Sequence, residues 1–521
     1  MSDPQTVYGW FERSATAFGD DCTALEVGEE QLTYRQLREL AERIATRLVA
    51  FNGGVAPRRV GLLASRSVTA YAGYLAVLRT GAAVVPLNPE HPPARTARIA
   101  ETAGLELVLA DPSAADADPG VPLLVLGPGE PPPSAAGAPG GPPDGLPDPK
   151  TRPDDIAYII FTSGSTGAPK GVPVSQANLC SYLGHVASRY GIGPGSRLSQ
   201  TFDLTFDGSV HDLFVAWASG GTLVVPKRSQ LLSPVRTINA LRLTHWFSVP
   251  SLIAFASRLG TLEPGSMPTL RWSVFGGEPL TLAAAAEWQT AAPDSALEVL
   301  YGPTELTISC TAYRLPRHRA DWPRTANGTV PIGTGYPTLD ILLLDDDGRP
   351  SEAGELYVRG PQRFPGYLDP ANNAGRFLPS GGGAAAAADS ADLPLTEKHW
   401  YRTGDRAAMH DGHLVHLGRT DHQVKIRGHR IELGEIEATL REQPGVRDAV
   451  VLAVQASDGE PELEAAVSGT GCVDQRLYSA LSERLPPYML PRRIVTLEEL
   501  PLNANGKIDR HALLARLGSS R

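Results

Sequence analysis

Apolar runs and helical patterns alternate along most of the chain. Val60–Leu63 and Ala83–Leu87 are continuous apolar runs, and Val68–Arg79 between them spaces its apolar residues with the period of a helix. Ala94–Ala103 has a similar helical pattern. Further apolar runs are found at Leu107–Leu109, Leu123–Leu126, Ala157–Phe161, Thr222–Val225, Trp246–Val249, Trp272–Phe275 and Glu298–Tyr301. Because parallel sheets are built from strands joined by crossover helices, the pattern predicts a large α/β domain.

The pattern changes near Gly418, where charged residues and glycines become dense. Beyond this point, Gly434–Glu442 and Gln475–Arg484 have helical patterns, and Ala449–Val454 is a strand candidate. The sequence therefore predicts an α/β fold with a large N-terminal domain of packed β-sheets and helices. A smaller α+β C-terminal domain of roughly 100 residues follows it.

Two segments are typical of surface loops. Gly127–Pro153 is crowded with proline, glycine and alanine, and Pro379–Asp392 contains the runs Gly381–Gly383 and Ala384–Ala388. The alanine run leaves a helical turn open as an alternative, because alanine is the best helix former.

Composition and charge exclude some classes of function. The 521 residues carry a formal net charge of -10, which argues against wrapping nucleic acid or binding an anionic membrane. No apolar run reaches the ~20 residues of a spanning helix, and the polar first residues are not typical of a signal peptide. The scattered cysteines indicate reduced thiols in a cytoplasmic protein. They are Cys22, Cys180, Cys310 and Cys472.

The segment Thr162–Gly171 predicts a loop that binds polyphosphate. It reads Thr-Ser-Gly-Ser-Thr-Gly-Ala-Pro-Lys-Gly and follows the apolar run Ala157–Phe161. Glycines let backbone N–H groups approach an anion, hydroxyl side chains add donors, and Lys170 adds positive charge. Pro169 stands where a Walker A loop has glycine, so the loop is of another kind. The alternative is a solvated Ser/Gly loop without a ligand.

This loop resembles the phosphate loop of the adenylate-forming superfamily, which contains amino-acid adenylation domains, acyl- and aryl-CoA ligases and firefly luciferase. The other motifs of the superfamily follow in order and cover nearly the whole chain. They are Leu32–Leu37, Leu78–Leu87, Tyr301–Glu305, Gly354–Leu356, Gly366–Leu368, Tyr401–Asp405, Gly418–Glu437, Leu485–Pro491 and Asn505–Arg510. The resemblance implies the adenylate-forming enzyme fold, with a large domain at 1–417, a hinge at 418–421 that contains Asp421, and a small mobile domain at 422–521.

The resemblance also implies a reaction, in which a carboxylate attacks the α-phosphorus of ATP and pyrophosphate leaves. Two anions must meet, so positive charge has to neutralise both. By resemblance Lys507 is the cation that touches the carboxylate and the α-phosphate, and Lys170 serves the phosphate loop. Glu305 and Thr162 would hold Mg²⁺, a hard cation that prefers oxygen ligands. The implied cofactors are therefore ATP and Mg²⁺.

The nucleotide contacts are likewise implied by resemblance. Tyr301 would stack on adenine beside the backbone of Gly277, Glu278 and Pro279. Asp405 would accept hydrogen bonds from the ribose, unless it is only a turn aspartate. The remaining expected contacts are Thr162, Ser163, Gly164, Ser165, Thr166, Gly167, Lys170, Gly302, Thr304, Arg419 and Lys507.

Asp207 indicates which acid is activated. In amino-acid adenylation domains the matching aspartate pairs with the substrate ammonium, and acyl- and aryl-acid ligases generally lack it. A buried unpaired carboxylate is costly, so an aspartate in the acid pocket favours a cationic partner. The alternative is a surface turn that also contains Asp203. By resemblance the pocket is lined by Asp207, Gly208, His211, Phe247, Val274, Gly276, Leu300, Ile308 and Ser309.

The predicted pocket favours a small or medium uncharged amino acid. Gly208 and Gly276 leave volume, Phe247 removes some, and His211 offers a polar contact unless it is a packed residue. A slip of one residue would place Ser248 in the position given to Phe247. A β-amino acid stays open, because its ammonium is displaced by only one carbon.

The expected partner is a carrier protein. The sequence contains no Gly-Gly-x-Ser phosphopantetheine site and no His-His-x-x-x-Asp segment. We therefore expect a free-standing enzyme that passes its acyl group to a phosphopantetheine thiol on a separate carrier, in secondary-metabolite biosynthesis. Two alternatives are an acyl- or aryl-CoA ligase that uses free CoA, and an inactive scaffold relative. Gln176, where the superfamily usually has histidine, leaves the gating of the pocket open.

Overall fold

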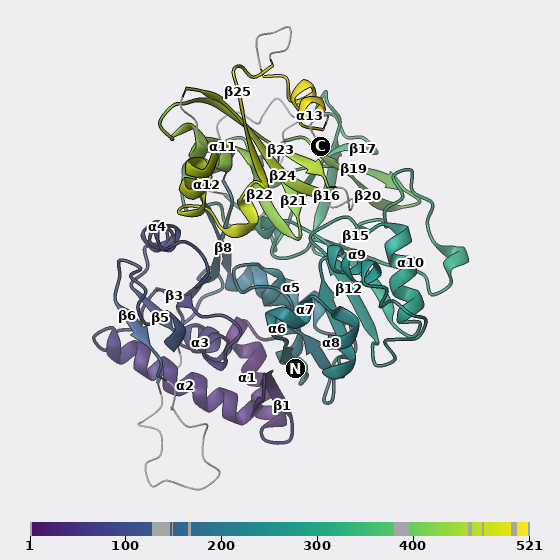
Figure 1. The fold of residues 1–521 in the computed structure, drawn as a ribbon. Coiled ribbons are helices and arrows are strands. Elements are labelled where there is room, and N and C mark those ends of the chain that lie inside the picture. Colours follow the sequence, from purple (N-terminus) through teal and green to yellow (C-terminus); the bar gives the residue numbers. More distant parts are fainter. Residues whose placement is uncertain are drawn as a thin grey trace. The chain divides into compact units, whose positions relative to one another are not determined.

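The computed structural model, shown in Figure 1, describes residues 3–127, 146–147, 149–164, 168–379, 395–421, 423–456, 461–470, 474–501 and 508–518. The chain divides into two compact units. Unit 1 contains 1–89, 100–160 and 171–420, and unit 2 contains 90–99, 161–170 and 421–521. The two short segments of unit 2 come from the part of the sequence predicted to form the large domain. The hinge at 418–421 stays a prediction. Most of the two predicted loops lies outside the described residues.

The largest sheet of unit 1 has nine strands within the described residues. In sheet order they are β15 (Thr334–Gly335), β14 (Thr311–Arg314), β13 (Ala296–Tyr301), β12 (Trp272–Gly276), β11 (His245–Ser248), β9 (Arg197–Ser199), β10 (Thr222–Val225), β1 (Thr23–Val27) and β2 (Glu30–Thr33). The strands from β13 to β1 are parallel, and the edge strands β14, β15 and β2 are antiparallel. The central strands are therefore buried on both faces, as their continuous apolar runs predicted.

Two further sheets complete unit 1. The first has the order β6 (Leu123–Val125), β5 (Leu107–Ala110), β3 (Arg59–Leu63), β4 (Ala83–Leu87), β7 (Ile156–Thr162) and β8 (Lys170–Ser175), and its last two strands extend into unit 2. The second is antiparallel and contains β16 (Asp340–Leu344), β17 (Ala353–Arg359), β18 (Phe377–Leu378), β19 (Trp400–His410) and β20 (His413–Arg419).

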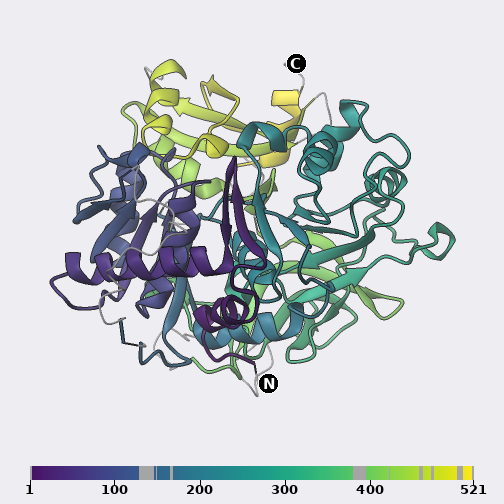
Figure 2. The same ribbon diagram turned by 90° about the horizontal axis from the view of Figure 1, so that it is seen from below.

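The helices of unit 1 are buried to different extents, from every residue of the helix Gly208–Trp217 to none of the short helix Arg228–Leu231. They are α1 (Val7–Phe18), α2 (Tyr34–Phe51), α3 (Val68–Arg79), α5 (Gln176–Val186), α6 (Gly208–Trp217), α7 (Arg228–Leu231), α8 (Pro234–Ala240), α9 (Ser251–Arg258) and α10 (Leu282–Ala291). Figure 2 shows α2, in purple, as a long unbroken helix. It begins with a capping box, in which the Thr33 hydroxyl accepts from the Gln36 N–H and the Gln36 side chain accepts from the Thr33 N–H.

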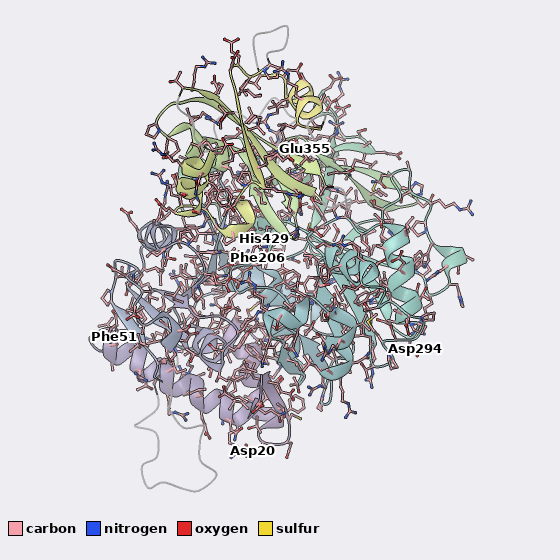
Figure 3. All side chains as sticks on the ribbon, viewed as in Figure 1. Asp20, Phe51, Phe206, Asp294, Glu355 and His429 are labelled. Carbon is pink, nitrogen blue, oxygen red and sulfur yellow. The ribbon has the colours of Figure 1, made fainter. Side chains whose placement is uncertain are left out.

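Unit 2 is an α+β body around a three-stranded sheet. Its described elements are α4 (Pro93–Ala103), which extends into unit 1, β21 (Gln423–Ile426), β22 (His429–Glu432), α11 (Leu433–Arg441), β23 (Val446–Gln455), β24 (Pro461–Gly469), α12 (Asp474–Ser482), β25 (Arg493–Leu497) and α13 (Arg510–Gly518). α11 and α12 pack on one face of this sheet, and α13 packs on the other. His429, labelled in Figure 3, stacks on Tyr488 with ring centroids 3.8 Å apart.

Most of the predicted elements are confirmed. The predicted helix Val68–Arg79 and the predicted strands Ala83–Leu87 and Thr222–Val225 have the same bounds in the structure. Within the described part of the chain, no helix is long and apolar enough to cross a membrane. The described cysteines, Cys22, Cys180 and Cys310, are free thiols.

Candidate active site

The predicted pocket residues on the large sheet gather at its carboxyl-terminal edge. Phe247 lies near the end of β11, Val274 and Gly276 lie near the end of β12, and Leu300 and Tyr301 end β13. In open parallel sheets, ligands bind outside the carboxyl ends of the strands. The strand arrangement therefore brings these five residues together at the edge where a ligand is expected.

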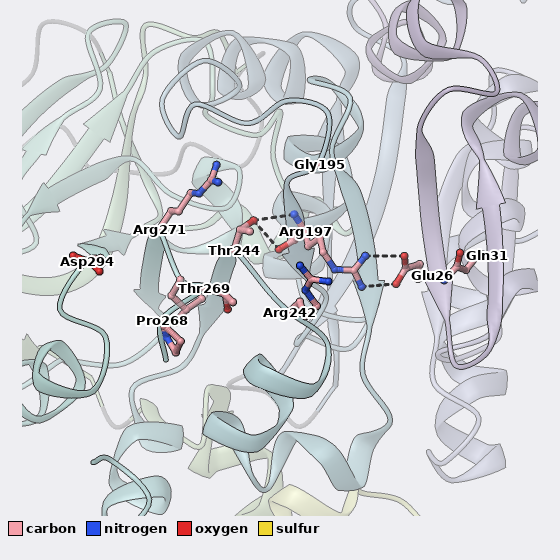
Figure 4. Close-up of a pocket in the computed structure, with 11 residues that line it drawn as sticks. Glu26, Gln31, Gly195, Arg197, Arg242, Thr244, Pro268, Thr269, Arg271 and Asp294 are labelled. Atoms are coloured by element: carbon pink, nitrogen blue, oxygen red, sulfur yellow. Dashed lines mark hydrogen bonds and ion pairs between the residues drawn. The ribbon is translucent and has the colours of Figure 1, made fainter. Parts of the chain in front are cut away.

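A hollow of about 650 Å³ lies at the opposite edge (Figure 4). Arg197, Thr244 and Arg271 line it where β9, β11 and β12 begin. The Arg197 guanidinium donates to both carboxylate oxygens of Glu26, at 2.8 and 2.6 Å. The residues that line this hollow include none of the predicted site residues, so it is separate from the candidate site.

Asp405 is a buried carboxylate bound by donors from other strands. The Tyr301 hydroxyl donates to its Oδ2 at 2.7 Å, and the Arg419 guanidinium donates to its Oδ1 at 2.8 Å. The Nε2 of His416 lies 3.1 Å from the same Oδ1. Burial raises the pKa of Tyr301 well above its usual value, and the charge of Asp405 raises it further, so the hydroxyl keeps the proton that it donates. Three predicted nucleotide residues thus form one hydrogen-bonded cluster.

Glu305 is fully buried in unit 1. Its Oε1 accepts a hydrogen bond from the Tyr367 hydroxyl at 2.6 Å, and this hydroxyl lies 3.2 Å from that of Tyr401. Thr304 begins the short 3-10 helix that contains Glu305, and Gly302 follows the end of β13. The motif after Tyr301 thus carries a carboxylate whose position is fixed by a neighbouring tyrosine.

Gly277, Glu278 and Pro279 directly follow β12. The Oε2 of Glu278 accepts a hydrogen bond from the N–H of Ser251, the first residue of α9, at 3.1 Å. Its carboxylate is therefore engaged by a helix N-terminus, which is a favourable place for negative charge. The role of the segment beside adenine stays a prediction.

The first residues of the predicted phosphate loop belong to unit 2. Thr162 ends β7, and Lys170, which begins β8, is buried. The Ser163 hydroxyl donates to the carbonyl of Arg430 at 2.8 Å and accepts from the N–H of Glu432 at 3.1 Å. The predicted residues Ser165, Thr166, Gly167 and Lys507 lie outside the described residues.

A buried ion pair lies next to this loop within unit 2. Arg95 Nη1 and Glu435 Oε1 are 2.8 Å apart, and the side chains are 5% and 1% exposed. The other oxygen of Glu435 accepts a hydrogen bond from the N–H of Gly164 at 3.2 Å. A carboxylate thus binds an N–H group that resemblance assigns to a phosphate. Asp421, predicted as the hinge residue, begins the long segment of unit 2.

Asp207 precedes α6 and is half-buried, with its Oδ2 fully buried. It follows Phe206, which Figure 3 labels. Burial raises the pKa of Tyr158 and of Tyr182 well above the usual value, and the negative charge of Asp207 adds to both shifts. This carboxylate therefore acts on two buried tyrosines, and the alternative of a fully exposed turn aspartate does not hold.

A chain of polar groups lies in the same region. The Tyr182 hydroxyl lies 2.6 Å from Nδ1 of His211, and the Ser309 hydroxyl lies 2.7 Å from that of Tyr336 and 3.5 Å from that of Tyr182. Burial lowers the pKa of His211 to about 3, so its imidazole is neutral at ordinary pH. His211 is both packed and polar: its ring centroid lies 4.8 Å from that of Phe247.

The alternation of side chains along β11 supports Phe247 over Ser248. Phe247, Val274, Leu300 and Ile308 belong to the same apolar core. Ser248 points away from it, because its hydroxyl accepts a hydrogen bond from the indole N–H of Trp246 in the second core. Neighbouring residues of a strand face opposite sides of the sheet, which favours Phe247 as the pocket residue.

The volume that Gly208 and Gly276 leave is closely bordered by other groups, and their role in opening the pocket stays a prediction. A Cβ on Gly208 would lie 2.9 Å from the ring of Phe202. A Cβ on Gly276 would lie 3.0 Å from the carbonyl oxygen of Leu300 and 3.3 Å from the Phe247 ring. The space that the glycines leave is therefore taken up largely by two phenylalanine rings, which a count of side-chain volumes could not reveal.

Four functional candidates were missed by sequence reasoning: Tyr158, Tyr182, Tyr336 and Phe202. They come from separate elements, and no local motif marks them. The periodicity of α5 could have placed Tyr182 on its buried face. Gln176 is buried at the start of α5, and its Oε1 accepts a hydrogen bond from the N–H of Val7 at 2.8 Å. It is a packing residue that joins α5 to α1.

Comparison with known families agrees with this geometry. Residues 11–368 match the family described as AMP-binding enzyme, and residues 435–507 match the AMP-binding enzyme C-terminal domain. The chain belongs to the AMP-binding enzyme family. The resemblance to the adenylate-forming superfamily predicted from the sequence is thus confirmed, and the family implies the use of ATP.

Curated relatives are peptide synthetases. The chain is 38% identical over 534 residues to the phosphinothricin tripeptide synthetase PhsC of Streptomyces viridochromogenes, covering 99% of this chain and 46% of the relative. It is 33% identical over 520 residues to tyrocidine synthase 3 of Brevibacillus parabrevis, covering 98% of this chain and 8% of the relative. The chain thus spans less than half the length of these relatives.

Solved structures of this AMP-binding enzyme's relatives have the same fold. The Vibrio cholerae adenylation domain AlmE in complex with glycyl-adenosine-5'-phosphate aligns with a TM-score of 0.82 at 28% identity, covering 100% of this chain and 99% of that one. Holo-PA1221, a nonribosomal peptide synthetase protein containing adenylation and PCP domains, aligns with a TM-score of 0.80 at 27% identity, covering 99% of this chain and 84% of that one. The predicted fold class is confirmed.

Proposed function

We propose that this AMP-binding enzyme activates an amino acid: the substrate carboxylate attacks the α-phosphorus of ATP, and aminoacyl-AMP and pyrophosphate form. The observation that carries the proposal is the position of Asp207, half-buried beside an apolar and aromatic cluster at the carboxyl-terminal edge of the large sheet. A carboxylate in such a place favours a cationic partner, and the ammonium of an amino acid supplies one.

The acceptor in the second step is a phosphopantetheine thiol on a carrier protein or carrier domain. Two findings support this part of the proposal. The curated relatives are large peptide synthetases of which this chain matches one part, and PA1221 contains adenylation and PCP domains together. The product would be an aminoacyl thioester for peptide assembly.

Mg²⁺ is the proposed metal, with Glu305 as a protein ligand. Within the described residues, no group of three or more His, Cys, Asp or Glu side chains forms a cation cage. Mg²⁺ does not require one, because it usually takes one or two protein oxygens together with substrate phosphates and water. Glu305 fits this role: one oxygen is fixed by Tyr367, and the side chain carries a hard anionic donor. The ion would neutralise phosphate charge.

The substrate side chain is expected to be uncharged and of small to medium size. His211 is neutral because its pKa is lowered to about 3, and the neighbouring hydroxyls of Tyr182 and Ser309 are neutral as well. A charged side chain would lose its hydration there without gaining an opposite charge. The rings of Phe202 and Phe247, whose centroids lie 4.7 Å apart, restrict bulk.

ATP–pyrophosphate exchange across a panel of acids tests the proposal. The panel should contain α- and β-amino acids, fatty acids and aryl acids. We expect exchange with an uncharged amino acid and none after Lys507→Ala, because the cation that links the two anions is then absent. Exchange that depends only on a fatty or aryl acid, with free CoA as acceptor, would contradict the proposal and favour a CoA ligase.

A further inference from the structure

Two consecutive residues of the candidate site adopt a left-handed backbone although neither is glycine. Thr307 has a φ of 59° and Ile308 a φ of 74°. Both are β-branched, and such side chains crowd the backbone in this region. Strain of this kind persists only where the surroundings impose it, and it concentrates at functional sites. The turn begins after Glu305 and Leu306 and leads into Ser309.

Gln362 is the side chain that spans this turn. Its Nε2 donates to the carbonyl of Ser309 at 2.9 Å and to the carbonyl of Leu306 at 3.3 Å. Its own backbone carbonyl accepts a hydrogen bond from the Thr307 hydroxyl at 2.6 Å. One amide group therefore ties together the residues before and after the strained pair, and a third bond holds the first member of that pair.

Burial makes the loss of any of these hydrogen bonds costly. Gln362 and Thr307 are fully buried, and Ser309 is 1% exposed, so water cannot replace a bond that is lost. The Oε1 of Gln362 is also buried, and no described residue donates a hydrogen bond to it. A glutamine that leaves its oxygen unsatisfied indicates that the fold requires its N–H donors at this position.

The Thr307–Ile308 turn also fixes the positions of two side chains of the acid pocket. Ile308 belongs to the core that contains Phe247, and the Ser309 hydroxyl bonds to that of Tyr336. A change in the φ of Thr307 or Ile308 would move both side chains, because the turn is the segment that aims them. The hydrogen bonds of Gln362 to the turn involve neither Asp405 nor Tyr301 of the nucleotide cluster.

We propose that Gln362 is a positioning residue for acid recognition, which clamps the Thr307–Ile308 turn and thereby fixes the wall of the pocket formed by Ile308 and Ser309. This inference rests on the proposed function, because Ile308 and Ser309 are pocket residues by resemblance. Gln362 acts through the backbone, so its removal should alter acid selection and leave ATP binding intact.

Gln362→Leu removes both N–H donors and replaces the amide by an apolar side chain of similar size. We expect the KM of the preferred acid to rise by at least about tenfold, the KM of ATP to change by less than about twofold, and the preference over the next larger acid to fall in parallel. Thr307→Gly in the Gln362→Leu background should restore most of the acid KM, because glycine adopts positive φ without strain.

A buried serine elsewhere in unit 1 provides the control. Ser295→Ala removes a buried hydrogen bond to Ser273, in which the hydroxyl oxygens lie 2.8 Å apart. This variant should lower the Tm without changing either KM. Ser295→Ala thus shows what a general loss of stability does to the two KM values. Rescue by Thr307→Gly is expected only if Gln362 acts by positioning the turn.

The wild-type exchange panel is measured first and gives the preferred acid. If that acid is not an amino acid, the proposed function fails, and the Gln362 variants are then tested with the acid that is preferred. A folded Gln362→Leu enzyme with unchanged acid KM and selectivity overturns the inference, as does an equal rise in the KM of ATP. If Gln362→Leu does not fold, Gln362→Met, which keeps the length of the side chain and lacks N–H donors, is judged by the same two outcomes.

Discussion

The hydroxyl of Tyr301 donates a hydrogen bond to Oδ2 of Asp405 at 2.7 Å. The sequence motifs that contain these residues are about a hundred positions apart, and resemblance gave them different roles, one at adenine and the other at ribose. In the structure they form one cluster with Arg419, which donates to the other oxygen of Asp405. The acceptor expected to meet the ribose is therefore oriented by the residue expected to meet adenine.

Tyr301→Phe should weaken ATP binding selectively. The substitution keeps the ring but removes a hydrogen bond to a buried carboxylate, so we expect the KM of ATP to rise about tenfold while the amino-acid KM stays constant. Initial rates of pyrophosphate exchange measure both constants. Tyr313→Phe, on the neighbouring strand β14, is the matched control and should change neither. An unchanged KM of ATP in Tyr301→Phe would show that the cluster does not serve the nucleotide.

Glu305→Gln should raise the Mg²⁺ concentration that gives half-maximal exchange. The amide keeps the shape of the side chain but loses the negative charge that a hard cation prefers. Glu355→Gln is the control, because Glu355 is also buried and accepts a hydrogen bond from a tyrosine, Tyr357, at 3.1 Å. We expect a shift of about tenfold or more for Glu305→Gln and none for Glu355→Gln. Equal Mg²⁺ requirements would remove Glu305 as a ligand.

The stability of the protein should fall in mild acid partly because of His211. Burial lowers the pKa of His211 from 6.5 to about 3 in the folded state, so the unfolded chain takes up the proton first. This contribution to stability is fully present above pH ~6.5 and is lost as the pH falls towards 3. Between pH ~7.5 and pH ~5 it amounts to about 2 kcal/mol.

His211→Gln removes this titration. Urea unfolding of the wild type and of the variant at the two pH values measures the difference, and we expect the variant to lose about 2 kcal/mol less stability. The pKa of His245 is lowered to about 4 by burial, and His245→Gln should act in the same direction. Identical pH dependence in wild type and His211→Gln would mean that His211 is not buried as a neutral group.

Each member of the Arg95–Glu435 ion pair should stabilise unit 2 only while its partner is present. Arg95→Met leaves a buried carboxylate without its cation, and removal of one partner of a buried pair costs about 3 to 5 kcal/mol. Replacing both residues, as Arg95→Met with Glu435→Leu, should recover most of that loss. Arg484→Met breaks the exposed pair with Glu442 and should cost less than about 1 kcal/mol.

Hydrogen exchange of amides in α11 and β23 reports on the stability of unit 2. We expect Arg484→Met to be the least destabilised variant, the double variant to be intermediate, and Arg95→Met to be the most destabilised. A double variant as unstable as Arg95→Met would instead show that the groups are needed individually, for example Glu435 for its bond to the Gly164 N–H.

Apolar strands and helices with a clear period were predictable from sequence, and strands with many polar residues were not. The runs in β3, β4 and β10 are apolar throughout, and α3 has a helical period with turn residues at both ends. β19, in contrast, reads Trp-Tyr-Arg-Thr-Gly-Asp-Arg-Ala-Ala-Met-His, and only its pairing with β17, β18 and β20 defines it as a strand.

The candidate site divides in the same way. Motif residues such as Asp405 and Glu305 could be named because the segments that contain them resemble motifs of the adenylate-forming superfamily. Tyr182 and Tyr336 come from distant elements and meet only in the folded chain. The left-handed turn at Thr307 and Ile308 gave no warning in the sequence, because the residue that usually marks such a turn is glycine.

The most direct test of the account compares an amino acid with the same acid lacking its amino group, in the wild type and in Asp207→Asn. Exchange rates give kcat/KM for the four combinations. We predict that Asp207→Asn loses at least about 30-fold in kcat/KM for the amino acid and almost nothing for the des-amino acid, because only the first presents an ammonium to the carboxylate. An equal loss for both acids, or no loss for either, would contradict the claim that Asp207 recognises the amine.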